Sequence, residues 1–295
     1  IGYSAAFNRG RENVESLADR VATTVPSSTG ANLYGWLGAI PGLKKWIGER
    51  EIQKVSDNAY SIANEKFELT VGVPRDDIED DNYGVYTPMM EAMGESTALH
   101  KDERVSEAVK NGFTEKCYDG QPFFSERHQV GSITYSNKGD AKLDAESFQA
   151  ARQSIMSLKN EKGQPLNIVP NVLLVPPALE KEARMILEAE LVNGTSNINK
   201  GLAEVVVWSQ LADKPTQWYL LCTKRSLKPF IFQERRKAKF TAMTRETDEN
   251  VFMRSEYLYG VDARDGVGYG FWQMAYGSTG TASSMGCLKT GRRQD

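Results

Sequence analysis

The most informative part of this 295-residue chain is residues 33–81. It opens with YGWLGAIPGLKKWIGER (residues 34–50) and closes with VPRDDIEDD (residues 73–81). Between these blocks, apolar side chains recur at every second position: Phe67, Leu69, Val71 and Val73. That period is typical of a strand with one buried face. We expect a long β-hairpin over 49–74, with Ile52 and Val55 on the other strand. A two-stranded ribbon is marginal alone in water, so it needs another surface to lie on.

Composition narrows the class of protein. Hydrophobic residues make up 40% of the chain and charged residues 25%, which is typical of a folded domain. No apolar run is long enough to span a membrane, so we expect no membrane partner. The net charge of −3 lacks the basic balance of a dedicated nucleic-acid binder. Cys117, Cys222 and Cys287 are widely spaced and odd in number, which fits neither a disulfide framework nor a metal site and indicates a reducing compartment.

Local patterns predict a mixed α and β organisation. A short helix over 13–22, broken by VPSSTG (residues 25–30), predicts an arm that is flexible until a partner orders it. Residues 87–111 have helical spacing, and His100–Asp102 could divide that helix in two. From residue 136 the pattern becomes α/β. It includes a helix capped by Asp144, a buried strand over 172–175 and a helix after Pro176–Pro177.

The last part of the chain has β character again. Strands are expected over 239–245, 251–261 and 267–276. The glycine-rich segment 266–270 lacks the spacing of a phosphate loop, and we interpret it as a turn at Asp265–Gly266 that enters a strand. The tail beyond Gly277 is rich in Gly, Ser and Thr, so we expect it to be loosely ordered.

Residues able to do chemistry are sparse. His100 and His128 are the only histidines, and neither has metal-ligand spacing to a second His or Cys. Cys117 has no activating base nearby in sequence. The acidic run 76–81 fails the EF-hand pattern, which requires Gly and Glu at fixed places. We therefore predict no catalytic residue, no cofactor-binding residue and no metal ligand, and a protein that is not an enzyme.

Three blocks of the sequence resemble the major head subunit of Mu-like phages and prophages. These are the Trp/Gly/Pro block at 34–50, the acidic run with YGVY (residues 75–86), and GFTEKCYDGQ (residues 112–121). Their common order is far more specific than any one motif, and the resemblance extends from about Leu33 to Gly277. Residues 1–30 and 278–295 match less clearly.

The resemblance implies an α+β fold, similar to the Hong Kong 97 type of tailed-phage capsid protein. In that architecture residues 1–32 form an N-terminal arm and residues 33–81 an extended hairpin loop. A peripheral domain with a long spine helix comprises 82–135 and 235–277. A central, or axial, α/β domain comprises 136–234. Residues 278–295 form a C-terminal tail.

The implied function is that of a major capsid protein, located in the virion and assembled in the host bacterial cytoplasm. Subunits would form hexamers and pentamers that close an icosahedral shell around double-stranded DNA, with scaffold and portal proteins and a decoration protein as further partners. We expect the hairpin face to be satisfied only on contact with a neighbouring subunit. The predicted inter-subunit residues are Phe67, Leu69, Val71, Val73, Arg75, Asp76, Asp77, Asp80, Asp81, Arg235 and Arg236.

A basic stretch near residue 230 has two interpretations, a solvated face or a contact with DNA or with a neighbour's acidic run. Its members are Lys224, Arg225, Lys228, Arg235, Arg236, Lys237 and Lys239. Because Ile1 is not an initiator, a maturation cut before it is a further hypothesis.

Three alternatives remain open at the level of sequence. A nanocompartment shell protein would share the same fold. An α/β enzyme would have its site in 136–234, with convergent polar groups in a pocket. A soluble monomeric binding module is disfavoured, because an exposed hairpin edge invites aggregation.

Overall fold

The structure is a computed structural model that describes residues 2–34, 37, 60–80, 84–192 and 194–282. The chain forms two compact units. The first contains residues 1–111 and 227–270, and the second contains residues 112–226 and 271–295. From the sequence, we expected the boundaries between the peripheral and central domains near residues 135 and 234, and the end of the peripheral domain near residue 277. No helix among the described residues is long and apolar enough to cross a bilayer.

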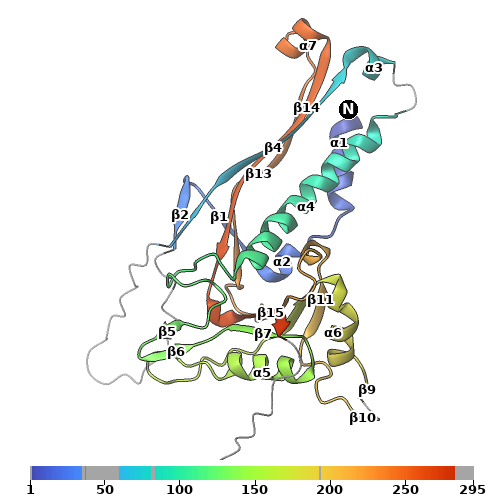
Figure 1. The fold of residues 1–295 in the computed structure, drawn as a ribbon. Helices are drawn as coiled ribbons and strands as arrows, with labels where there is room; N and C mark the ends of the chain where they lie inside the picture. The colour runs from blue at the N-terminus through green and yellow to red at the C-terminus, as the bar shows by residue number, and fades with distance from the viewer. Residues whose placement is uncertain (1, 35–36, 38–59, 81–83, 193, 283–295) are drawn as a thin grey trace, which may run out of the picture. The chain divides into compact units, whose positions relative to one another are not determined.

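The first unit is built on long strands (Figure 1). Among the described residues, four strands form one sheet in the order β1-β13-β14-β4. Their bounds are β1 Ala22–Pro26, β13 Phe230–Met243, β14 Glu256–Tyr269 and β4 Glu65–Pro74. β1 is parallel to β13, and the other pairs are antiparallel. β13 and β14 form a long hairpin whose tip is the short helix α7 (Glu249–Arg254).

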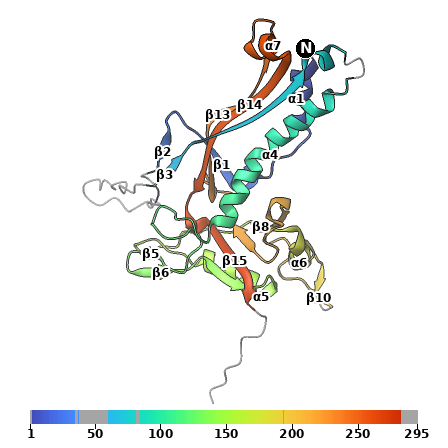
Figure 2. The same ribbon diagram turned by 45° about the horizontal axis from the view of Figure 1, so that its top comes forward.

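Two helices of the first unit run side by side in both views (Figures 1 and 2). Helix α4 (Thr87–Asn111) is continuous, so the expected break at His100–Asp102 does not occur. Helix α1 (Gly2–Glu12) packs along it. The buried cluster between these helices and the sheet comprises Ala6, Phe7, Val73, Met90, Met93, Tyr259 and Val261.

The prediction for the N-terminal segment was wrong in two respects. Of the helix expected over 13–22, only Ala18–Val21 are helical, as the short helix α2; α1 ends upstream at Glu12, and after α2 the chain enters strand β1. The segment is also folded onto its own unit, because Ala6 and Phe7 are buried against α4. Tertiary contacts override the local pattern here.

Asp102 shows how α4 and α2 are joined. Its buried carboxylate accepts hydrogen bonds from the backbone N–H groups of Leu17 (3.1 Å) and Ala18 (3.0 Å) and from the Ser16 hydroxyl (2.5 Å). We expected Asp102 to start a new helix within 87–111. Instead it satisfies the free N–H groups at the start of α2.

The described part of the hairpin expected over 49–74 pairs with strands other than its expected partner. β4 pairs with β14 over its whole length, from Glu65 opposite Asp265 to Pro74 opposite Glu256. Upstream, β3 (Ser61–Ala63) pairs with β2 (Ala31–Leu33). The other strand of the expected hairpin, with Ile52 and Val55, lies outside the described residues, as does most of the Trp/Gly/Pro block.

The second unit has an α/β core. Among the described residues, its five-stranded sheet has the order β11-β8-β12-β15-β7. The strands are β11 Glu204–Val207, β8 Val172–Val175, β12 Trp218–Leu221, β15 Ala275–Ala282 and β7 Lys138–Ala141. The strand expected over 172–175 is confirmed at those residues. Smaller hairpins are β5–β6 (His128–Val130, Ile133–Tyr135) and β9–β10 (Leu191–Val192, Thr195–Ser196).

Helices α5 (Ala145–Met156) and α6 (Glu180–Leu187) contribute to the main core of the second unit. Leu173, Val175, Trp218 and Leu220 project from alternate strand positions into that core. Asp144 caps α5 as predicted, accepting from the Ser147 N–H at 2.7 Å. The side chains at the strand positions in between do not enter this core. Tyr219, for example, contacts Phe124, with ring centroids 5.5 Å apart.

The last β region also differs from expectation. Three strands are present, but with other bounds than expected: β13 and β14 are long and separated by α7, and β15 follows. Asp265 and Gly266 lie inside β14, paired with β13, so the expected turn at that position was wrong. β15 continues to Ala282, and the rest of the 278–295 tail lies outside the described residues.

Candidate assembly surface and buried polar network

Strand β4 lies at an edge of the first unit's sheet. One row of its backbone groups bonds to β14, and no other strand among the described residues pairs with its second edge. The strand is long, covering Glu65–Pro74. A long open edge is a ready template for pairing with another chain. β4 is therefore the first candidate for an assembly surface.

The alternating side chains of β4 are covered to different extents by the first unit itself. Val73 is buried at 3% exposure and Val71 packs beside it, whereas Leu69 is 37% exposed. The centroid of the Phe67 ring lies 4.5 Å from the centroid of the His100 ring. It lies 4.7 Å from the central guanidinium carbon, Cζ, of Arg104. The expectation that this face is satisfied only by a neighbouring subunit was wrong for Phe67, Val71 and Val73, because α4 and its core already contact them.

A buried carboxylate holds α4 to the sheet beside Phe67. Asp265, 3% exposed, faces His100 Nε2 at 2.7 Å and Arg104 Nε at 3.4 Å. Arg104 also pairs with Glu65 at 2.5 Å. Because a buried carboxylate needs partners to offset its lost hydration, this network ties β4, β14 and α4 together at one end.

The acidic run begins directly after β4. Residues Arg75–Glu79 form the short helix α3, and Asp76, Asp77 and Asp80 are exposed. Arg75 is used within the chain, since its Nε donates to Glu79 at 2.6 Å and its guanidinium lies 3.6 Å from Glu246. The hydrogen bond from Arg75 lowers the pKa of Glu79. Asp81 lies outside the described residues.

The basic stretch is divided between the two units. Lys224 and Arg225 belong to the second unit, whereas Lys228 and the residues after it belong to the first. Arg225 donates to the Asn167 carbonyl oxygen at 2.6 Å, and Arg236 pairs with Asp262. Arg235 and Arg236 are exposed on β13.

The structure does not bring Arg236 together with the acidic helix α3. In the sheet register Arg236 lies opposite Arg264, which lies opposite Lys66 at the start of β4. α3 follows the other end of β4. Within one chain, the predicted basic and acidic contact residues are therefore separated along the strand.

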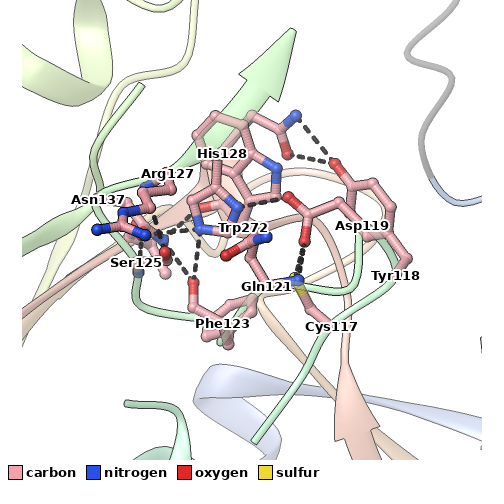
Figure 3. A network of polar contacts seen from close by, with 12 residues as sticks. Cys117, Tyr118, Asp119, Gln121, Phe123, Ser125, Arg127, His128, Asn137 and Trp272 are labelled. Carbon is pink, nitrogen blue, oxygen red and sulfur yellow. Dashed lines mark hydrogen bonds and ion pairs between the residues drawn. The ribbon is translucent and has the colours of Figure 1, made fainter. Parts of the chain in front are cut away.

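A second candidate site is a buried polar network in the second unit (Figure 3). Cys117 and Asp119 lie in a tight turn closed by hydrogen bonds from Cys117 N to Gln121 O (2.9 Å) and from Gly120 N to Cys117 O (3.0 Å). Gly120 has φ = +80°, a conformation that favours glycine. The turn directs the Cys117 thiol and the Asp119 carboxylate to the same side, with Sγ and Oδ1 3.1 Å apart.

His128 completes the network from the first position of β5. Its Nδ1 lies 2.5 Å from Asp119 Oδ2, and its ring stacks on Trp272 at 4.2 Å between centroids. The His128 side chain is fully buried, while that of Asp119 is 17% exposed. Cys117, Asp119 and His128 each offer one ligand atom, and these atoms all lie within 4.8 Å of one another.

Asn137 fixes the orientation of the imidazole. Its oxygen accepts from Ser125 N at 2.8 Å and lies 3.1 Å from His128 Nε2. Its amide nitrogen donates to three carbonyl oxygens, those of Phe123, Trp272 and Ala275. The three carbonyl acceptors identify the nitrogen end of the Asn137 amide, so its oxygen end must face His128. Because that oxygen can only accept a hydrogen bond, His128 Nε2 carries a proton. Nδ1 is left to face the Asp119 carboxylate.

The electrostatics of this network do not suit a nucleophile. Burial, followed by the neighbouring Asp119 carboxylate, raises the pKa of the Cys117 thiol well above its ordinary value. Burial alone would raise the pKa of Asp119, but the hydrogen bond and charge of His128 outweigh it and hold that pKa below its usual value. A catalytic cysteine needs a lowered pKa, so Cys117 is not an activated thiol.

Sequence reasoning missed this cluster. Cys117 and Asp119 stand two residues apart, whereas His128 and Asn137 come later in the chain and Trp272 is contributed from near the end of the fold. In the sequence we looked for potential metal ligands at the short spacing of a local motif, and that criterion does not detect residues brought together by the fold. The turn-forming sequence CYDGQ (residues 117–121) was the available signal, because it predicts that two donor side chains lie on one loop.

Comparison with known proteins identifies the class to which this fold belongs. The sequence matches the family described as Mu-like prophage major head subunit gpT over residues 1–142, 132–211 and 209–287. It is 39% identical over 269 residues to the major capsid protein of Escherichia phage Mu, covering 91% of this chain and 68% of that protein.

Solved structures agree with the sequence match. A chain of the procapsid of bacteriophage JBD30 is 36% identical, with a TM-score of 0.59, and the match covers 95% of this chain and 75% of that one. A chain of the JBD30 capsid decorated with minor capsid protein trimers is 30% identical, with a TM-score of 0.56, covering 67% of this chain and 91% of that one.

The fold and these matches define a structural protein of a phage shell rather than an enzyme. The chain belongs to the family of Mu-like prophage major head subunits. Proteins of this family are the major capsid proteins of Mu-like tailed-phage heads, and the place of this chain is accordingly the capsid of the virion. The resemblance inferred from residues 34–50, 75–86 and 112–121 is confirmed.

Proposed function

We propose that the chain is a Hong Kong 97-type subunit that assembles as hexamers and pentamers into a closed icosahedral head around double-stranded DNA. In this assignment the first unit supplies the N-terminal arm (1–32), the extended loop (33–81) and the peripheral domain. α4 is its spine helix. The second unit, with its five-stranded α/β core, is the axial domain. The long helix beside a long-stranded sheet supports this division.

The observation that carries the proposal is the edge of β4 with which no strand in the described part of the chain pairs. Backbone N–H and C=O groups along that edge can pair with another chain, as edge strands commonly do. Leu69 offers apolar surface that the first unit leaves exposed. The edge of one subunit would lie on the peripheral domain of the next, and many modest contacts of this kind reinforce one another in a closed shell.

Charge complementarity supplies a second contact. The exposed carboxylates of α3 and the exposed Arg235 and Arg236 of β13 have opposite sign but are separated within one chain. A neighbouring subunit can bring them together, which steers the approach of the two chains. The partners are thus predicted to be Asp76, Asp77, Asp80 and Asp81 on one subunit and Arg235 and Arg236 on another.

Other partners follow from the head that such a subunit builds. The related JBD30 capsid is decorated with minor capsid protein trimers, which supports a decoration protein here as well. Scaffold and portal proteins are expected during assembly of the precursor shell. Contact with packaged DNA is non-specific, because several basic side chains of the 224–239 stretch are already paired within the chain.

The experiment is electron microscopy of the purified chain together with its sedimentation. Closed shells, or rings of five or six subunits, are the expected result. The same measurement on the Leu69→Asp variant tests the role of β4, because a carboxylate at this exposed position opposes apolar contact without disturbing the buried cluster. Normal shells from that variant would remove Leu69 from the interface. A chain that remains monomeric even when co-expressed with its scaffold would contradict self-assembly.

A further inference from the structure

We propose that Cys117, Asp119 and His128 bind one divalent transition-metal ion of the zinc class, which stabilises the second unit. Nothing in the capsid function requires such an ion. The inference rests on the donor atoms, on the way other residues hold them, and on the balance of charge in the buried site.

The donor set is the first argument. A thiolate, an imidazole nitrogen and a carboxylate oxygen are the ligands that Zn²⁺ takes in proteins, at about 2.0–2.3 Å from the metal. Such lengths place the donors of one tetrahedral ion roughly 3–4 Å apart. Here Sγ lies 3.1 Å from Asp119 Oδ1, Nδ1 lies 2.5 Å from Oδ2, and all three ligand atoms lie within 4.8 Å of one another. The side chains need only small adjustments to surround an ion.

The outer contacts are the second argument. A metal-bound histidine usually donates its other ring N–H to an oxygen acceptor, which fixes the tautomer and aims the free nitrogen at the metal. His128 has this arrangement, because Nε2–H faces the Asn137 oxygen (3.1 Å) and the Phe123 carbonyl oxygen (3.2 Å). Stacking on Trp272 further restrains the ring. Asp119 Oδ1 is held in turn by the Gln121 N–H at 3.0 Å.

The charge balance is the third argument. With a divalent ion, the site is neutral when a thiolate, a neutral imidazole and a carboxylate surround it, and the protons displaced from the ligands pass to solvent. Neutrality matters because His128 and Cys117 are buried, where an unbalanced charge is costly.

A fourth ligand would reach the ion from the side of Asp119, the more exposed of the two side chains. That side chain is 17% exposed, whereas His128 is fully buried. A water molecule on the exposed side would complete a tetrahedron. The ion would join the loop of 112–127 to strand β5, so its role is to stabilise a part of the second unit that contains little regular structure.

The test uses the full-length chain, reduced and freed of metal with a chelator, and Co²⁺ as a spectroscopic probe. A variant with Cys222→Ser and Cys287→Ser keeps Cys117 as its single thiol. We expect this variant to bind one Co²⁺ per chain with a sulfur-to-cobalt charge-transfer band, and Zn²⁺ to abolish the band by displacement. The wild-type chain should give the same band.

Adding Cys117→Ser to that background should remove the band. In the thermal melt of the wild-type chain, Zn²⁺ should raise the midpoint, as expected of a ligand that binds the folded state. The rise should be lost with Cys117→Ser and retained with Cys222→Ser. A cobalt spectrum of the wild-type chain without a sulfur band would overturn the proposal, whether or not the variants fold. So would equal Zn²⁺ stabilisation of the Cys117→Ser chain. Either result would leave the network as a proton-mediated ion pair.

Discussion

Gly94 of α4 lies directly against the backbone of Phe7 in α1. A Cβ atom added to Gly94 would stand 2.0 Å from the Phe7 carbonyl oxygen, and one added to Gly10 would stand 1.9 Å from the carbonyl oxygen of Glu91. The two helices therefore cross with almost no space between their backbones, and each contributes a glycine to the crossing. Phe7 and Ala6 are buried as a result.

We predict that Gly94→Ala separates α1 from α4. The methyl group cannot be accommodated against backbone atoms, so we expect a loss of about 1–3 kcal/mol in the free energy of unfolding and faster proteolysis within residues 2–12. Urea denaturation and limited proteolysis measure these effects. Gly2→Ala is the matched control, since nothing lies within 4 Å of a Cβ at Gly2. Equal stability of the Gly94→Ala chain and the wild type would contradict the close crossing.

Phe67 is only partly covered by α4, and we predict that Phe67→Asp prevents shell formation, by placing a charge on the part of the face that a neighbour would contact, while the second unit stays folded. The new carboxylate would lie beside the Arg104 guanidinium, which now packs over the Phe67 ring, so the first unit should tolerate it locally. Electron microscopy and circular dichroism together separate assembly from folding. Thr70→Asp, an exposed position on the other face of β4, is the control and should assemble. Normal particles from Phe67→Asp would exclude this face from the interface.

We predict that changing Asp76, Asp77, Asp80 and Asp81 together to Lys impairs assembly. The change reverses the charge that is proposed to attract Arg235 and Arg236 of a neighbour, and like charges in contact repel. Light scattering during assembly measures the rate. Adding Arg235→Glu and Arg236→Glu to the acidic-run variant, in the same chain, should partly restore its assembly. If the first variant assembled as the wild type does, the acidic run would be a solvated helix that makes no contact with a neighbouring subunit.

We predict that Asp119 stabilises the second unit at neutral pH but not in acid. Because the pKa of Asp119 is lowered in the folded state, its ionised form contributes stability above the unfolded pKa of about 3.9, and this contribution is lost as pH falls through the folded pKa. Urea denaturation of the metal-free chain at several pH values should show wild type more stable than Asp119→Asn near neutral pH. In acid, the free energies of unfolding of the wild-type and Asp119→Asn chains should become equal. A difference that does not change with pH would rule out the Asp119–His128 ion pair as its cause.

Local patterns were sufficient for some of the second unit's regular elements. The apolar run Val172–Val175 lies between prolines and forms a buried strand, and Asp144 begins a helix by capping it with Ser147. These features depend on a few neighbouring residues, so the sequence analysis found them. The buried network was missed because His128, Asn137 and Trp272 meet only after the loop of 112–127 packs in the fold.

The arm and β4 show the same limit in the first unit. The helix expected over 13–22 is shortened to Ala18–Val21, and the chain then enters β1, where Ala22–Pro26 pairs with β13 from more than two hundred residues later in the chain. Phe67 and Val73 were expected to await another subunit, yet α4 covers them. Local spacing records which side chains are apolar, but it does not record which surface will bury them.

Residue patterns alone indicate the family, through three ordered blocks, and the type of many elements, through period and capping. Which element each one contacts follows from the folded chain: β4 pairs with β14, Gly10 and Gly94 let α1 and α4 pack closely, and a thiol, a carboxylate and an imidazole converge. The physical reason is that backbone pairing and close packing join residues far apart in the chain, and those long-range contacts are the ones that outweigh local preference.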